Sequence, residues 1–96
     1  MVRLRIPDYL VKFIRGLHPG LKGKIKGALK SITLDPDSGK PLKDELEGYR
    51  GIRVSRFHII YRVESPNVIQ IVAVGSRATI YEETYRLIMK ESKDIK

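Results

Sequence analysis

The residues best suited to chemistry gather between positions 48 and 81 of this 96-residue chain. His58 carries the side chain that most readily accepts or donates a proton near neutral pH, so it is the best candidate for a general acid or base. Arg53 and Arg77 are permanently charged and can fork onto phosphate oxygens, and Tyr81 can stack on a base. Antiparallel strands in this region would bring Arg53, His58 and Arg77 onto one surface. The spacing therefore predicts one site that binds phosphate and moves a proton.

The charge of the whole chain favours a polyanionic partner. Nineteen Lys and Arg residues stand against eleven Asp and Glu, which gives a net charge of +8. A soluble domain that is simply basic is the plain alternative, and any single residue of the proposed site is more often an ordinary surface residue. The density of positive charge in so short a chain favours nucleic acid or an acidic partner protein.

Several classes of site are excluded by what the sequence lacks. It contains no cysteine, which excludes disulfides, thiolate catalysis and cysteine metal sites. The two histidines, His18 and His58, lie far apart, and no metal-ligand spacing, phosphate-binding glycine loop or Ser-His-Asp arrangement is present. No signal peptide and no membrane-spanning stretch is apparent, so we expect a cytoplasmic protein with no metal, no cofactor and no membrane partner.

The patterns along the chain predict one α+β domain over residues 1–96. Alternation over Val2–Ile6 indicates a strand with a basic outer face. Helical spacing then indicates two helices, broken at His18-Pro19-Gly20, that form a hairpin. The later elements are expected at 51–55, 57–63 and 68–74 (strands) and at 80–89 (a terminal helix). We expect the N-terminal strand and the helical hairpin to pack on an antiparallel sheet of about four strands.

The strand at 57–63 decides which side chains reach the site. Its alternation places two sets of residues on opposite faces. Phe57, Ile59, Tyr61 and Val63 form the set better suited to lie under the helices. His58 and Arg62 then fall on the face away from the helical hairpin.

Three segments in order resemble the RelE/ParE superfamily of toxins from toxin–antitoxin modules. They are LDPDSGKPLKDELEGY after the helical hairpin, RVSRFHIIYRV in the strands, and VAVGSRATIYEET near the end. The resemblance covers nearly the whole chain and implies a compact α+β fold and a cognate antitoxin that neutralises the toxin. In the RelE branch it implies cleavage of mRNA at the ribosome, in which the 2′-hydroxyl of the messenger attacks the adjacent phosphate and neither metal nor cofactor is needed.

The resemblance also implies roles for individual residues. Arg53 matches a basic strand position used at the scissile region, Arg77 matches the arginine of a GxR motif, and Tyr81 matches an aromatic that stacks or assists proton transfer. With His58 these form the expected catalytic set. The arginines expected to bind RNA beside that set are Arg50, Arg56 and Arg62.

Two departures from the nuclease pattern keep an alternative open. His58 stands where many members have an arginine, and Gly51 stands where ribosome-dependent nucleases often have a basic residue. The ParE branch, whose members inhibit DNA gyrase and lack the nuclease residues, is therefore the alternative to the mRNA endoribonuclease. A toxin that has lost activity and only binds its antitoxin is a third reading.

Overall fold

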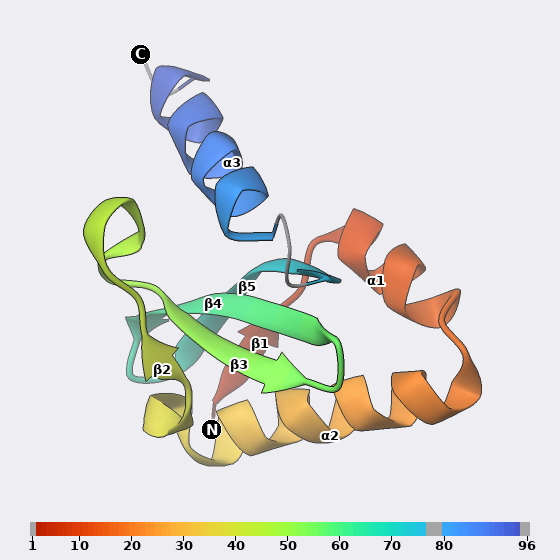
Figure 1. Ribbon diagram of the computed structural model, residues 1–96. Coiled ribbons are helices and arrows are strands. Elements are labelled where there is room, and N and C mark those ends of the chain that lie inside the picture. The colour runs from red at the N-terminus through yellow and green to blue at the C-terminus, as the bar shows by residue number, and fades with distance from the viewer. Residues whose placement is uncertain (1, 77–79, 95–96) are drawn as a thin grey trace.

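A computed structural model of the protein describes residues 2–76 and 80–94 and shows a sheet with helices on both sides (Figure 1). The elements in chain order are β1 (Arg3–Arg5), α1 (Asp8–Arg15), α2 (Pro19–Leu34), the single turn η1 (Pro36–Ser38), β2 (Lys40–Pro41), the single turn η2 (Asp44–Leu46), β3 (Arg50–Val54), β4 (Phe57–Ser65), β5 (Val68–Ser76) and α3 (Ile80–Asp94). This order confirms the expected α+β fold with a helical pair near the N-terminus and a terminal helix.

The sheet differs from the expectation in strand number and in one direction. Its five strands lie in the order β1-β5-β4-β3-β2. All neighbours are antiparallel except β1, which runs parallel to β5, with Arg3 opposite Val68. The sheet is therefore mixed. The fifth strand, β2, has only two residues, which is too short for alternation to reveal.

Local signals explain where the first two helices begin and end. Pro7 precedes α1, which carries Asp8 in its first turn and Lys12 and Arg15 in its last, as the helix dipole favours. The α2 helix begins at Pro19, and the Nδ1 atom of His18 accepts a hydrogen bond of 3.2 Å from the Gly20 amide. His18 thus caps α2, because its ring nitrogen satisfies one of the amides that the first turn leaves unpaired.

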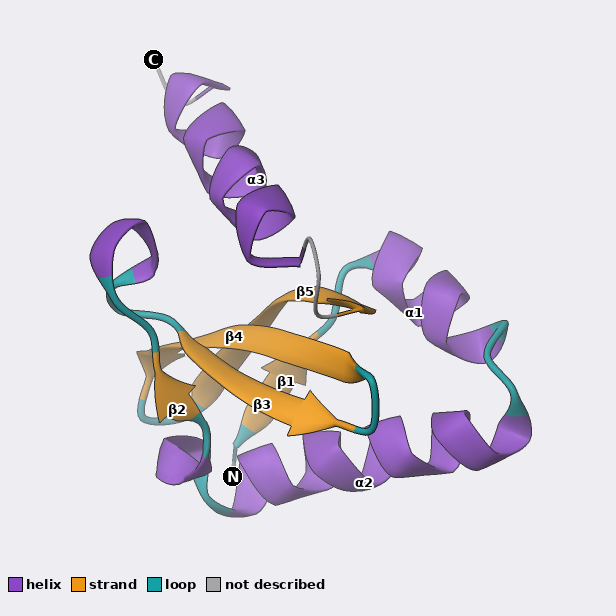
Figure 2. Cartoon of the chain, in the orientation of Figure 1, coloured by secondary structure: helices purple, strands orange, loops and turns teal. Residues whose placement is uncertain are grey.

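The main core lies between these helices and one face of the sheet (Figure 2). Its buried residues come from both helices and three strands: Leu10, Ile14, Ile25, Leu29, Ile32, Val54, Ile59, Tyr61, Ile69, Ile71 and Val74. The opposite face carries a smaller cluster of Ile60, Ala73 and Ile80, where α3 meets the sheet. Ile59 and Tyr61 thus lie beneath the helices, as the alternation of β4 predicts. Val63, expected on the same face, is 38% exposed and lies outside the main core, because the strand register shifts between Ile60 and Tyr61 and again between Val63 and Ser65.

Tyr61 fixes the loop that follows α2. Its ring is fully buried, and its hydroxyl donates to the Pro36 carbonyl at 2.7 Å and accepts from the Gly39 amide at 2.9 Å. A Cβ atom on Gly39 would lie only 2.8 Å from the Tyr61 ring carbon Cε1. The glycine is therefore required by this close approach of the loop to the ring.

We expect Tyr61→Phe to lower the free energy of unfolding by about 1–3 kcal/mol, because it leaves a buried amide and a carbonyl without their partner. Chemical denaturation of the purified full chain measures this loss. Tyr9→Phe serves as the control, since that hydroxyl is on an exposed residue and its bond to the Val72 carbonyl is long, at 3.3 Å. Equal losses for the two variants would contradict the anchoring role of Tyr61.

None of the helices within the described ranges has the length and apolar character needed to cross a membrane.

Candidate functional site

The strand register places Arg53 and His58 side by side. Arg53 of β3 pairs with His58 of β4, and His58 pairs in turn with Gly75 of β5. Their neighbours Ile52 and Ile59 pack in the main core beneath α1 and α2. Since successive side chains of a strand alternate, Arg53 and His58 lie on the face away from those helices, where the sequence analysis expects them.

The first turn of α3 brings Tyr81 to this face. The Tyr81 hydroxyl lies 2.9 Å from His58 Nδ1, and the two rings meet edge to face with centroids 5.3 Å apart. Either group can be the donor, depending on the histidine tautomer. His58 is half-buried and Tyr81 is 36% exposed, so the pair is ordered by packing and still open to a ligand.

Small residues on the strands allow α3 to approach so closely. A Cβ atom on Gly75 would lie 2.9 Å from Ile80 Cδ1, and one on Gly51 would lie 3.6 Å from the Tyr81 hydroxyl. Ala73 lies beside Ile80 in the smaller core. The sequence reasoning does not identify Gly75 as part of the site, although a glycine between apolar strand residues indicates that another backbone approaches closely.

The β3–β4 hairpin carries two arginines, one of which pairs with His58 across the strands. The Nε atom of Arg53 donates to the Ser55 carbonyl at 3.2 Å, which directs the side chain along the hairpin while leaving it exposed. Arg56 occupies the turn itself and is also exposed. Ser55 adopts a positive φ of 58°, the kind of conformation that a two-residue hairpin turn requires. Two exposed guanidinium groups therefore precede the histidine in the same hairpin.

The other two arginines expected to bind RNA are held elsewhere. Arg50 donates to the Gly39 carbonyl at 2.8 Å and pairs with Asp37 at 3.4 Å, so it fastens the loop after α2. Arg62 donates to Glu64 at 2.8 Å and lies over the Tyr49 ring.

The hydrogen bond to Glu64 raises the pKa of Arg62 above its ordinary value, because the carboxylate stabilises the charged guanidinium. The structure does not bring Arg50 or Arg62 to the His58–Tyr81 pair, and their RNA contacts stay predictions.

Arg77, the fourth residue of the expected catalytic set, lies outside the described residues, and its role also stays a prediction. Over residues 2–76 and 80–94, no group of three His, Cys, Asp or Glu side chains is placed to hold a metal ion. The described part of the site is therefore a histidine–tyrosine pair beside exposed arginines. Such a site can bind a phosphate and exchange a proton with it.

Comparison of the sequence with known families finds one match. The model of the family described as ParE toxin of type II toxin–antitoxin system, parDE, matches residues 3–81. No curated protein matches the chain in sequence. The matching segment includes β1 to β5 and ends at Tyr81, so it contains every residue of the candidate site.

Comparison of the fold finds toxins from several bacteria. A RelBE toxin–antitoxin complex from Mycobacterium tuberculosis matches with a TM-score of 0.68 and 22% identity over 79% of this chain and 98% of that chain. A double arginine mutant of Escherichia coli RelE in the free state matches with a TM-score of 0.71 and 17% identity, over 94% of this chain and 96% of that chain. The YoeB–YefM complex from Staphylococcus aureus matches with a TM-score of 0.64 and 21% identity, over 80% of this chain and 98% of that chain. At these identities the matches show a shared fold.

Proposed function

Because the chain belongs to the ParE toxin family of type II toxin–antitoxin systems, we propose that it acts as a toxin by cutting mRNA at the ribosome. The observation that carries this proposal is the 2.9 Å contact between the Tyr81 hydroxyl and His58 Nδ1, beside the exposed Arg53. A hydrogen-bonded histidine and tyrosine can exchange a proton, which the cleavage of RNA requires. The solved toxins named RelE and YoeB share this fold.

The proposed reaction needs only proton transfer and charge stabilisation. The 2′-hydroxyl oxygen attacks the adjacent phosphorus, the bond from phosphorus to the 5′-oxygen breaks, and a 2′,3′-cyclic phosphate and a 5′-hydroxyl result. Tyr81 accepts the proton of the 2′-hydroxyl while its own proton passes to His58 Nδ1. The same pair returns a proton to the leaving 5′-oxygen. Arg53 stabilises the negative charge that builds up on the phosphate oxygens.

The roles of the remaining arginines belong to the same proposal. Arg56, exposed in the hairpin turn, contacts the RNA backbone next to the reacting phosphate. Arg77, placed by the family resemblance, supplies a second clamp on the phosphate. Substitution of Arg77 by alanine tests that role independently of the described geometry.

Inhibition of DNA gyrase is the second candidate function. Two observations favour it: the matching family model is named for ParE, and Gly51 replaces a basic residue expected in ribosome-dependent nucleases. Gly51 is buried, and a Cβ atom there would lie 3.4 Å from Leu42 Cδ2. The structure thus leaves little room for a longer side chain at this position.

One experiment separates the two functions. The purified full chain is added to a translating extract that contains a reporter mRNA, and in parallel to a gyrase supercoiling reaction. We expect mRNA fragments with 5′-hydroxyl ends, mapped by primer extension, and normal supercoiling. Intact mRNA together with inhibited supercoiling would replace the nuclease with the gyrase inhibitor.

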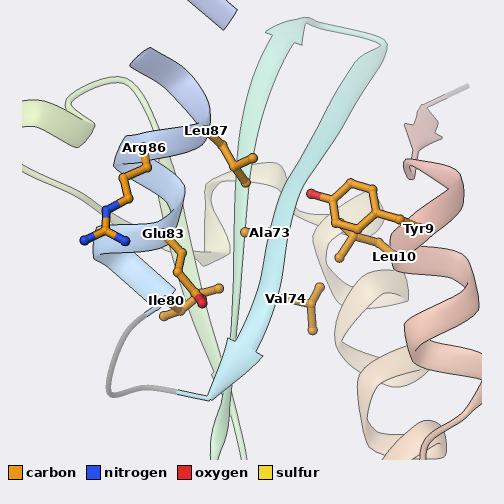
Figure 3. Close-up of a pocket in the computed structure, with 8 residues that line it drawn as sticks. All are labelled: Tyr9, Leu10, Ala73, Val74, Ile80, Glu83, Arg86 and Leu87. Atoms are coloured by element: carbon orange, nitrogen blue, oxygen red, sulfur yellow. The ribbon is translucent and has the colours of Figure 1, made fainter. Parts of the chain in front are cut away.

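We also propose that the cognate antitoxin covers an apolar groove between α1 and α3. Structures of related toxins with RelB and YefM support an antitoxin as partner. The groove encloses about 410 Å³, and Figure 3 shows Tyr9 and Leu10 of α1 on one side and the α3 side chains on the other. The residues that line it are Tyr9, Leu10, Ala73, Val74, Ile80, Glu83, Arg86 and Leu87. An apolar segment of the antitoxin would remove this surface from water.

Charge should govern how fast the antitoxin binds. With a toxin charge of +8 and an acidic antitoxin, we expect the association rate to fall at least tenfold between about 0.05 and about 0.5 M salt, because screening weakens steering at a distance. Stopped-flow mixing measures the rate, and the dissociation rate, which depends on groove contacts, serves as the internal control. An association rate that ignores salt would contradict electrostatic steering.

A further inference from the structure

The Tyr81 hydroxyl lies beside a group that can take its proton. A phenol is a weak nucleophile near neutral pH until a base removes that proton, and the base must lie within about 2.6–3.2 Å of the oxygen. The Tyr81 hydroxyl lies 2.9 Å from His58 Nδ1. In the tautomer that carries its hydrogen on Nε2, His58 accepts the phenolic proton. The Tyr81 oxygen itself can then attack an electrophile.

We propose that this oxygen attacks phosphodiesters that have no 2′-hydroxyl, so that the chain forms a covalent link to DNA. This activity goes beyond the proposed cleavage of RNA. In RNA the 2′-hydroxyl is held next to the phosphorus, and such intramolecular groups react as though present at about 10⁵–10⁸ M. The 2′-hydroxyl therefore reacts first, with Tyr81 only in the path of its proton. DNA lacks that hydroxyl, which leaves the Tyr81 oxygen as the nucleophile.

The proposed step is balanced without a co-reactant. The Tyr81 oxygen bonds to phosphorus, the bond from phosphorus to the 5′-oxygen breaks, and the phenolic proton passes through His58 Nδ1 to the leaving oxygen. The products are a phosphodiester that joins the 3′-oxygen of the DNA to Tyr81 and a free 5′-hydroxyl. Attack of that 5′-hydroxyl on the new phosphodiester reverses the step and restores both the DNA and Tyr81.

The Tyr81 oxygen is open on the side of β3. Gly51 and Arg53 are two positions apart on this strand and lie on the same face. A Cβ atom on Gly51 would lie 3.6 Å from the Tyr81 hydroxyl. Because glycine has no side chain, nothing from position 51 stands against the oxygen. Tyr81 is also 36% exposed, so a phosphate can approach the hydroxyl from solvent.

The groups around the oxygen divide proton transfer from charge stabilisation. His58 can take a proton, which an arginine in its place could not do near neutral pH. Arg53 is exposed and pairs with His58 across the strands, so its guanidinium can stabilise the charge that builds up on the phosphate oxygens. Glu82, next to Tyr81 in sequence, pairs with Arg86 at 2.6 Å. Its negative charge is therefore balanced within α3.

The Tyr81 ring is fixed before any ligand binds. Ile80 is buried, and a Cβ atom on Gly75 would lie 2.9 Å from Ile80 Cδ1, so the first turn of α3 packs tightly on β5. Figure 1 shows α3 rising away from the sheet beyond that turn. The rings of His58 and Tyr81 meet edge to face with centroids 5.3 Å apart. The nucleophile and its base are thus already oriented when a substrate arrives.

A suicide substrate tests the covalent step on the purified full chain. The probe is single-stranded DNA of random sequence, labelled at its 5′ end, in which sulfur replaces one leaving 5′-oxygen. The released thiol attacks the new phosphodiester poorly, so the adduct accumulates as a labelled band on a denaturing protein gel. We expect this band, and peptide mass spectrometry should place the DNA on Tyr81. His58→Gln should slow its formation about 10²-fold or more, because glutamine cannot take the phenolic proton.

Tyr81→Phe should give no adduct, because it removes the oxygen and keeps the ring. Tyr85→Phe is the matched control, since Tyr85 lies one turn further along α3 and is 37% exposed. It should form the adduct as fast as the unaltered chain, and equal thermal unfolding midpoints exclude a loss of folding. If the unaltered chain cuts mRNA but forms no adduct, or forms one on another residue, the covalent step is wrong and the nuclease stands. If the adduct forms on Tyr81 while mRNA stays intact, the nuclease fails and the covalent step stands.

Discussion

Replacement of His58 by glutamine is expected to slow RNA cleavage by about 10²- to 10⁴-fold, the usual contribution of general acid–base catalysis. Glutamine can still hydrogen-bond to Tyr81, but it cannot carry a proton near neutral pH. The dependence of the rate on pH between about 5 and 8 should flatten in the variant, since imidazole is the side chain whose ordinary charge change lies in that range and glutamine has none. Single-turnover cleavage on programmed ribosomes at a series of pH values measures both effects.

The 2.9 Å contact between His58 and Tyr81 predicts that the two act as one unit. We expect Tyr81→Phe to slow cleavage strongly and the double variant to be no slower than the worse single variant, because removing either member already breaks the proton path. Tyr49→Phe is the control, since that hydroxyl lies 3.3 Å from Arg62, away from the pair. Effects of His58 and Tyr81 that multiply in the double variant would contradict a shared path.

The alternation of β4 explains why the faces of the sheet can be predicted from sequence. Ile59 and Tyr61 are fully buried beneath α1 and α2, and His58, which directly precedes Ile59, faces the other way. A strand has only two faces, so once the apolar set is assigned to the core the remaining side chains have one place left. The pairing of Arg53 with His58 follows from the short turn between their strands.

The parallel pairing of β1 with β5 could not be predicted in this way. The alternation of Val2, Leu4 and Ile6 indicates a half-buried strand, but it contains no information about the partner strand or its direction. The contact between His58 and Tyr81 could not be predicted from alternation either. The two residues are 23 positions apart, and their contact depends on the missing side chain at Gly75, which allows Ile80 to pack against the strand.

The two distant arginines show a further limit of sequence reasoning. Arg50 and Arg62 carry the same charge as Arg53, yet one is bound to the loop after α2 and the other to Glu64. A charge count cannot distinguish an arginine that has a partner within the fold from one that remains exposed. That distinction depends on Asp37 and Glu64, whose ordinary surface positions give no signal in the sequence.

Removal of the guanidinium of Arg53 is the second substitution with a large expected effect. We expect Arg53→Ala to slow cleavage by about 10²- to 10³-fold, the typical loss when one group that stabilises transition-state charge is deleted. Arg53→Lys should recover only part of this loss, because lysine keeps the charge but cannot present two parallel donors to a phosphate. The fold should be little affected, since the bond that Arg53 makes to the Ser55 carbonyl is exposed.

The matched control for Arg53 is Arg3→Ala. Arg3 is an exposed arginine on β1, which lies at the opposite edge of the sheet from β2. Arg3→Ala therefore lowers the net charge by the same amount as Arg53→Ala, but away from the site. We expect it to change the cleavage rate less than about threefold, because a remote surface charge acts only through screened, long-range attraction. If Arg53→Ala and Arg3→Ala slow cleavage equally, the arginine contributes general charge and does not bind the reacting phosphate. If Arg53→Ala still arrests growth while mRNA stays intact and gyrase is inhibited, the target is the topoisomerase and the pair formed by His58 and Tyr81 serves binding.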